Sequence, residues 1–160
     1  MKKLTKSQMR VTIAKDALAQ LRLEKYVATK GTYIDQNLLN TLNFKYKETY
    51  EDKQAQPELE NLKECRVCAK GAIYLSTVRK FNDATICNFS TQAEIKATSI
   101  FGENNLTKIE SAFEEWTSQD TKGNDTNSKL NKFINKYPNK DVRLEKILLN
   151  VIRNKGVFKP

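Results

Sequence analysis

The fold of this chain centres on the stretch Glu64-Cys65-Arg66-Val67-Cys68-Ala69-Lys70-Gly71-Ala72-Ile73, near the middle of the sequence. The stretch combines a Cys-x-x-Cys pair, several small residues and two cations, and we expect it to lie inside a long helix over residues 58–82. Small side chains then share one side of that helix, because residues three and four positions apart are neighbours. A stripe that lets other backbones approach closely predicts a helix in the middle of the fold. Its members are Cys65, Cys68, Ala69, Ala72 and Ser76.

A second face of the predicted helix is cationic. Lys63, Arg66 and Lys70 recur at i, i+3 and i+7, so their side chains leave the helix on the same side. The pattern continues toward Arg79 and Lys80 near the end of the predicted helix. A tightly packed helix with such a stripe is suited to holding an anionic ligand.

Aromatic residues elsewhere in the chain extend this candidate site. Tyr33, Tyr74 and Trp116 offer ring surfaces on which a nucleobase can stack. The alternative is that the rings fill the core and the cations form a solvated face. The candidate ligand-binding residues are Lys63, Arg66, Lys70, Tyr33, Tyr74, Arg79 and Trp116.

The composition is that of a globular chain with a strongly solvated surface. Hydrophobic residues make up 39% and charged residues 29% of the 160 residues, and the net charge is +9. This surplus favours anionic partners such as nucleic acid, nucleotides, acidic protein surfaces or anionic lipid, although Lys-rich helices also serve solubility alone. Acidic residues cluster in 48–64 and 103–125, which predicts a dipolar molecule rather than a uniformly basic one.

Apolar runs and cysteines bear on where the protein works. No window approaches the eighteen apolar residues of a membrane span, and the first residues are polar. The three Cys residues all lie between positions 65 and 87, which is best explained by free thiols in a reducing compartment. We therefore expect a soluble cytoplasmic protein with no membrane partner. The sequence does not decide its oligomeric state.

The pattern along the chain predicts a mainly α fold. We expect a single compact helical domain over residues 1–160, with about six helices and room for one small β-hairpin near Tyr33 or residues 86–89. Few glycines and prolines, five and three, argue against an all-β protein. Surface loops are expected at 45–57 and 117–128, where the sequence is polar and poor in aliphatic residues.

Helix boundaries are predicted from capping residues. Thr5 or Ser7 begins a first helix that runs to about Tyr26, and Thr91 with Glu94 forms a capping box for a later helix that ends at Gly102. Another helix starts at residue 104 or 105, and a short one covers 129–136. Asp141 caps the last helix, Gly156 closes it in a Schellman motif, and Phe158 folds back onto it.

The residue inventory leaves little for catalysis. The chain has no His, which excludes Ser-His, Cys-His and His-metal sites, and no phosphate-binding glycine loop is present. A structural zinc needs about four ligands, and besides Cys65 and Cys68 only Cys87 and carboxylates remain. Neighbouring carboxylates such as Glu114 and Glu115 diverge on a helix and do not converge on one substrate. We expect no catalytic residues, no metal and no cofactor.

Several motifs resemble a family of small, uncharacterised phage and bacterial proteins. The chain is similar to them in its leading amphipathic helix and in Lys30-Gly31-Thr32-Tyr33. It also resembles them in the central Cys65-Arg66-Val67-Cys68-Ala69-Lys70-Gly71-Ala72, in Ile109 to Glu114 and in the ending Leu144 to Phe158. The resemblance covers about half the chain and implies a phage or mobile-element origin.

These observations lead to one main hypothesis and two alternatives. The main hypothesis is a non-catalytic phage or mobile-element inhibitor of a host defence system. It acts through its basic site on either a nucleotide-derived immune signal or a defence protein. A pocket bordered by Arg66, Lys70 and aromatic rings favours the signal, whereas a flat basic face favours the protein. The first alternative is a nucleic-acid-binding accessory protein, and the second is an enzyme that uses carboxylates, Lys, Tyr or Cys on a nucleotide-like substrate.

Overall fold

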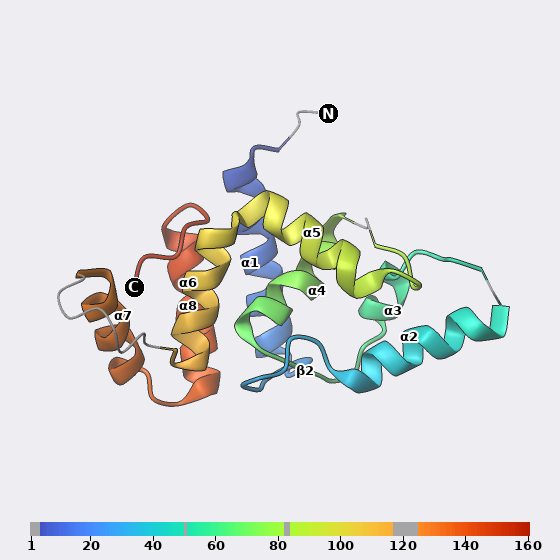
Figure 1. The fold of residues 1–160 in the computed structure, drawn as a ribbon, viewed down its shortest axis with the longest axis horizontal. Helices are drawn as coiled ribbons and strands as arrows, with labels where there is room; N and C mark the ends of the chain where they lie inside the picture. The colour runs from blue at the N-terminus through green and yellow to red at the C-terminus, as the bar shows by residue number, and fades with distance from the viewer. Residues whose placement is uncertain (1–3, 50, 82–83, 117–124) are drawn as a thin grey trace.

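Helices dominate the computed structural model, which describes residues 4–49, 51–81, 84–116 and 125–160 (Figure 1). The described part contains eight helices and two short strands, so the mainly α prediction is confirmed, with more helices than the expected six or so. In chain order the elements are α1 (Lys6–Arg22), β1 (Tyr26–Ala28), α2 (Gln36–Thr49), α3 (Gln56–Glu60), β2 (Cys65–Val67), α4 (Ala69–Phe81), α5 (Phe89–Phe101), α6 (Glu103–Glu114), α7 (Asp125–Lys136) and α8 (Lys140–Arg153).

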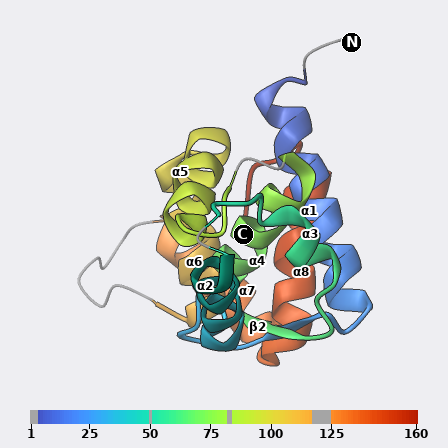
Figure 2. The ribbon, with the colours of Figure 1, turned by 90° about the vertical axis from the view of Figure 1, so that its right-hand side faces the viewer.

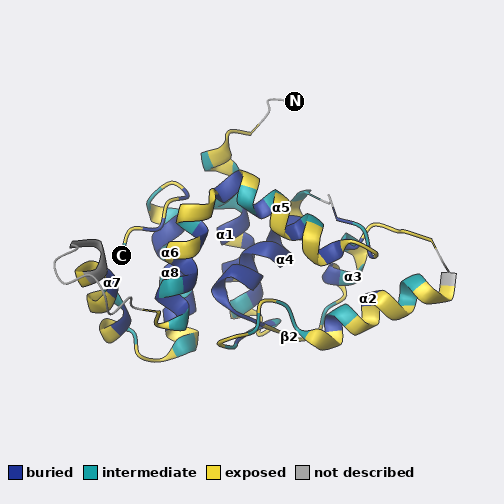
Figure 3. Cartoon of the chain, in the orientation of Figure 1, coloured by how far each residue is buried: buried dark blue, intermediate teal, exposed yellow. Residues whose placement is uncertain are grey.

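Helix α4 lies at the centre of the arrangement. It contacts α1, α3, α5 and α6, and α1 packs in turn along α8 (Figures 1 and 2). Ten consecutive residues of α4, Ala69 to Val78, are buried. A helix that is covered on all sides must sit inside the fold, which confirms the central position expected for the second half of the small-residue stripe. Figure 3 shows this concentration of buried residues on α1 and α4, while α2 is largely exposed.

The first half of that stripe is a strand, which corrects the predicted helix over 58–82. Cys65–Val67 forms β2 and pairs in parallel with β1, with Tyr26 opposite Cys65 and Ala28 opposite Val67. The two outer residues of β2 are buried and Arg66 is exposed, which is the alternation of a strand. Over so short a segment, the spacing of the small residues fits both the helical and the strand period. Pairing with β1 decides for the strand. The expected β-hairpin is therefore replaced by a parallel pair.

Several predicted boundaries also change. Helix α1 begins with the expected cap, since Thr5 and Gln8 form a capping box, but it ends at Arg22 because Tyr26 belongs to β1. Helix α5 begins at Phe89 after Asn88, so the Thr91–Glu94 capping box is wrong, while the predicted end at Gly102 is confirmed. The α8 cap is Asn139 rather than Asp141, because the Asn139 side chain accepts the backbone N–H groups of Asp141 and Val142.

The predicted loops are shorter than expected where the structure describes them. Helix α2 continues to Thr49 and α3 begins at Gln56, so the 45–57 loop is reduced to the segment between these helices. Of the 117–128 loop, residues 117–124 lie outside the described residues and the rest belongs to α7.

The chain end after α8 follows the prediction closely. The Gly156 N–H donates to the Val151 carbonyl at 2.8 Å, the bond that defines a Schellman motif. Lys155, with φ of 53°, takes the left-handed position one residue earlier than expected. Phe158 is buried and its ring meets that of Phe133 edge to face at 5.3 Å, so the tail docks between α8 and α7.

Arg143 joins the three helices at the C-terminal end of the fold. Its side chain is fully buried, and its guanidinium donates to the carbonyls of Tyr137, Phe113 and Pro138 at 2.7–3.0 Å. One nitrogen also pairs with Glu115 at 2.6 Å. The charge is tolerated in the interior because each of the three guanidinium nitrogens has an acceptor and Glu115 supplies the opposite charge. A single side chain therefore closes the end of α6, the α7–α8 connection and the first turn of α8.

We predict that Arg143→Ala lowers the free energy of unfolding by about 3–5 kcal/mol, because it leaves the buried Phe113 carbonyl and two partly buried carbonyls without donors and empties a buried site. Urea denaturation followed by circular dichroism measures the change. Arg153→Ala is the matched control: Arg153 is exposed at the end of α8, so the expected change is within about 0.5 kcal/mol. Equal stability of the two variants would contradict this role for Arg143.

Candidate functional site

A pocket opens between the segment that follows β1, helix α4 and helix α5. Its volume is about 490 Å³, and its lining includes Tyr33, Lys70, Tyr74 and Glu94. Ile34 and Leu39 add apolar surface, and Ser90 and Thr32 add hydroxyl groups. Pockets of this size with mixed apolar and polar walls are typical of small-ligand sites.

The wall that carries Tyr33 is placed by a close backbone approach. A Cβ at Gly71 on α4 would overlap the carbonyl oxygen of Tyr33, so only glycine lets the segment cross the helix there. Beside this crossing the Cys68 N–H donates to the Thr32 carbonyl at 2.6 Å. The Gly31 N–H donates to both carboxylate oxygens of Glu114, at 2.9 and 3.1 Å. The segment is thus fixed to α4 on one side and to α6 on the other.

Lys70, Glu110 and Tyr33 form a bonded cluster at the base of the pocket. The Tyr33 hydroxyl donates to one oxygen of Glu110, and the Lys70 ammonium lies 3.4 Å from the other. The same ammonium lies 5.4 Å from the centroid of the Tyr33 ring, within cation–π range. Lys70 and Glu110 are both buried, and the hydrogen bond to Glu110 raises the pKa of Tyr33. The hydroxyl therefore stays protonated, and the lysine charge is largely matched before any ligand arrives.

Tyr74 and Glu94 form a second pair on the α4–α5 side. The Tyr74 hydroxyl lies 3.3 Å from Glu94 Oε1, and its pKa is raised by burial and by the Glu94 charge. Glu94 is exposed and so keeps acceptor capacity toward the pocket. A carboxylate on the wall, with Glu110 behind it, makes this site less cationic than the sequence predicts.

Of the seven residues predicted for the site, the structure brings together Tyr33, Lys70 and Tyr74. Arg66 is excluded because it points outward from β2. Arg79 is excluded because it pairs with the buried Asp16 at 3.1 Å and donates to the Leu59 carbonyl.

Lys63 and Trp116 also lie outside the pocket. Lys63 lines a separate hollow near the end of α1, together with Glu24 and Glu145. Trp116 follows the end of α6 and is 56% exposed, and it is not part of the pocket wall. The predicted cationic stripe thus does not exist as one surface, because its members come from a loop, a strand and a helix.

Sequence reasoning missed the acidic members of the site. The sequence predicts a capping role for Glu94 and no role in the site for Glu110, yet these two carboxylates bind the hydroxyls of Tyr74 and Tyr33. Neither carries a local signal, because each meets its partner across the fold. Gly71 was detectable in principle, since a glycine inside a helical pattern indicates close packing. Glu114 and Glu115 anchor the segment before Tyr33, the latter through Lys30 at 2.8 Å.

Two of the three cysteines lie in the core. Cys65 and Cys68 are buried, Cys87 is exposed, and all three are free thiols. Burial raises the pKa of Cys65 and of Cys68 to about 11 in each case. Within the described residues, no group of three His, Cys, Asp or Glu side chains is arranged to hold a metal ion.

Comparisons with known proteins identify no relative of this chain. The chain matches no family model, no curated protein and no solved structure at a significant level. The resemblance to phage and bacterial proteins therefore stays a prediction. In the described part of the chain, no helix combines the length and the apolar character that crossing a membrane requires.

We predict that Gly71→Ala costs about 1–3 kcal/mol of stability and displaces the Tyr33 segment, because the added methyl overlaps its backbone. Amide NMR spectra should show shifts at residues 29–35. Gly102→Ala is the control: it has φ of +80° but no heavy atom near an added Cβ. It should cost about 1 kcal/mol or more through strain, with shifts confined to its own surroundings. An unmoved Tyr33 segment in the Gly71 variant would contradict the steric argument.

We predict that a thiol reagent at neutral to mildly alkaline pH labels Cys87 rapidly and the buried pair only after unfolding. The raised pKa keeps Cys65 and Cys68 protonated until the pH approaches about 11, so the reactive thiolate is scarce below that. Mass spectrometry against time counts the labels, and Cys87→Ser should remove the rapid phase. Three equally fast thiols, or stoichiometric zinc in the purified protein, would contradict this assignment.

Proposed function

We propose that this protein is a non-catalytic binding protein that holds a small nucleotide-derived ligand in the pocket between Tyr33, Tyr74 and Glu94. The observation that carries the proposal is the preformed wall of this pocket. Both tyrosine hydroxyls are already bonded to carboxylates. The segment bearing Tyr33 is fixed by the Cys68 N–H, just before α4, and by the Glu114 carboxylate of α6. A wall ordered in advance costs little entropy when a ligand binds.

The lining supports a ligand that presents its base and sugar to the protein. A flat ring is suited to the Tyr33 and Leu39 surface, and sugar hydroxyl or amino groups can donate to Glu94. Phosphates are disfavoured inside, because the one lysine of the lining is paired with Glu110. The proposed ligand class is therefore a nucleoside, or a nucleotide derivative whose phosphates stay at the pocket mouth.

Of the two forms of the inhibitor hypothesis, we propose the one in which the protein sequesters a nucleotide-derived signal. The kind of side chain expected to bind that signal changes. A pocket bordered by Lys70 and aromatic rings supports signal binding over docking on a flat basic face. Arg66 is absent from the pocket wall, and the carboxylate of Glu94 offers a hydrogen-bond acceptor where a cation was expected. The setting, a phage or mobile-element protein that disables a host defence, rests on the sequence resemblance and is part of the proposal.

Isothermal titration calorimetry with adenosine, guanosine, ADP-ribose and a cyclic dinucleotide tests the ligand class. We predict a dissociation constant below about 100 µM for at least one of them, with the free nucleoside binding within about tenfold of its phosphorylated form. No binding at this level by any probe would overturn the proposal. A strict requirement for phosphate would overturn the assignment of the base and sugar to the pocket.

Glu94→Gln should weaken the ligand so identified by about tenfold, corresponding to about 1.4 kcal/mol, because the amide is a poorer acceptor. The matched control is Glu48→Gln on the exposed face of α2, which should bind like the parent protein. Trp116→Ala should also bind normally, since Trp116 lies outside the pocket. Equal loss in Glu94→Gln and Glu48→Gln would show that charge alone, and not this pocket, governs binding.

Recovery of the ligand distinguishes a binding protein from an enzyme. We expect mass spectrometry to find the ligand unchanged after long incubation and heat denaturation. A product of altered mass, formed in proportion to protein concentration, would favour the enzyme alternative instead.

A further inference from the structure

The charge of this protein is divided between two ends of the fold. Residues 125–160, which form α7, α8 and the tail, contain nine Lys and Arg against three Asp and Glu. Residues 84–116, which form the α5–α6 side next to the pocket, contain two Lys and five Glu. Most of the net charge of +9 therefore lies away from the pocket and needs an explanation of its own.

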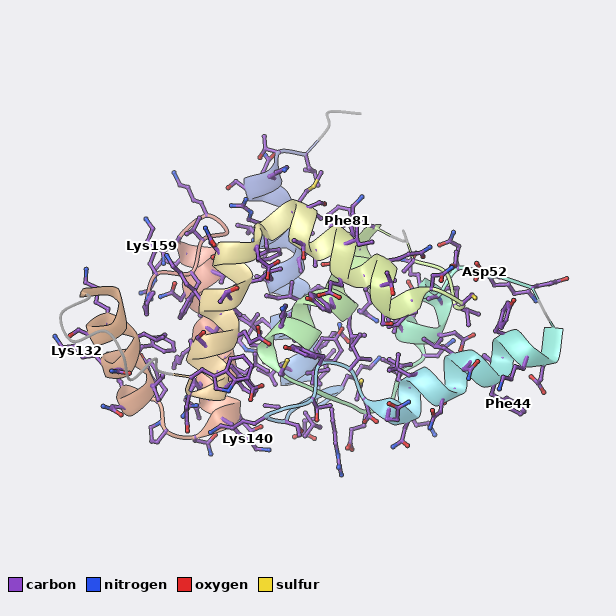
Figure 4. All side chains as sticks on the ribbon, viewed as in Figure 1. Phe44, Asp52, Phe81, Lys132, Lys140 and Lys159 are labelled. Atoms are coloured by element: carbon purple, nitrogen blue, oxygen red, sulfur yellow. The ribbon has the colours of Figure 1, made fainter. Side chains whose placement is uncertain are left out.

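Aromatic packing joins α7 to the C-terminal tail. Phe133 of α7 meets the rings of Tyr137 and Phe158 at 5.0 and 5.3 Å. Lys132 precedes Phe133 and Lys159 follows Phe158, so both lysines flank the contact between α7 and the tail. Figure 4 shows both on the same side of the molecule as α7. We name five exposed cations of residues 125–160 the α7–tail basic face: Lys132, Lys136, Arg153, Lys155 and Lys159.

Few acidic groups lie near this face. Glu145 is paired with Arg22 of α1 at 2.8 Å. Asp141 lies in the first turn of α8, near the end of α7 that carries Lys136 and at the opposite end of α8 from Arg153. Glu103 of α6 lines a hollow beside the tail, which it shares with Lys108. Lys159 is held in place by its backbone, which exchanges two hydrogen bonds with the Asn150 side chain at 2.6 and 2.9 Å. The face is thus cationic and its tail is ordered.

We infer that the α7–tail basic face binds the phosphate backbone of duplex nucleic acid, independently of the pocket. Several exposed lysines on one end neutralise phosphates and release counterions, which is the main source of sequence-independent binding. An acidic protein partner is less suited, because protein interfaces are depleted in Lys and need an apolar centre. Among the described residues of 125–160, the large hydrophobic side chains left exposed are Val142 and Val157.

A single strand is also less suited than a duplex. Single-strand sites depend on exposed aromatic rings on which bases stack. The rings of α7 and the tail are engaged with each other, and Lys136 lies over Tyr137 at 5.5 Å. Trp116, which follows α6, is a single exposed ring rather than a row on which successive bases could stack. Phosphate contacts without stacking favour the regular backbone of a duplex.

Fluorescence anisotropy with a labelled mixed-sequence DNA duplex tests the inference. We expect binding at about 50 mM salt, weakening toward 200 mM or so, with log affinity falling linearly against log salt at a slope of about −4 to −5 for five phosphate contacts. The double variant Lys132→Gln/Lys159→Gln should bind about tenfold more weakly and reduce the steepness by about 2. The matched control, Lys47→Gln/Lys63→Gln, removes the same charge from exposed positions elsewhere and should keep the parent slope.

Circular dichroism and thermal unfolding should be the same for both double variants, because all four lysines are exposed. Absence of duplex binding at low salt would overturn the inference, as would equal losses in the two double variants. Tighter binding to a single strand or to polyglutamate than to the duplex would also overturn it, in favour of a stacking site or an acidic protein partner. The titration uses no nucleoside, so its failure leaves the pocket proposal untouched.

Discussion

The close approach of the Tyr33 backbone to Gly71 is the constraint on which the functional part of this structure depends. Because α4 has no side chain at that point, the segment after β1 can cross it and turn its tyrosine over Lys70. The crossing also brings the Gly31 amide to Glu114 of α6. Because Gly71 lacks a side chain, the segment after β1 can pack directly on α4 and form the pocket wall. A bulkier residue at position 71 would push this segment away from α4.

Polar groups inside this fold are used to fix positions rather than to attract a charged ligand. Arg143 donates hydrogen bonds to three backbone carbonyls at the C-terminal end of the fold. Lys70 forms an ion pair with Glu110 next to the pocket. Such groups are tolerated because their hydrogen bonds are satisfied, and they specify one arrangement of neighbouring helices. The pocket, with its paired polar groups, and the basic residues of the C-terminal end therefore lie in different parts of the molecule.

The stretch around the two buried cysteines shows how a short pattern can support two structures. Cys65 and Cys68 are buried in either case, because small apolar side chains suit the core. Their three-residue spacing matches a helix, but β1 lies beside Cys65–Val67 and supplies a ladder of hydrogen bonds, so this part is a strand. Arg66 then leaves on the outside, and the cationic stripe predicted from helical spacing is divided.

The sequence by itself determined the helical class of the protein, the central place of Ala69 to Ser76, the end of α5 at Gly102 and the docking of Phe158, because periodicity and capping are local properties. It left Thr5 and Ser7 as alternative caps for α1, and the structure decides for Thr5. It also indicated three pocket residues, Tyr33, Lys70 and Tyr74, by type alone. Only the tertiary structure decided that β2 is a strand and that Glu94 and Glu110 complete the site. Their partners lie twenty or more positions away in the chain, and a charge pattern does not reveal which lysine is already paired.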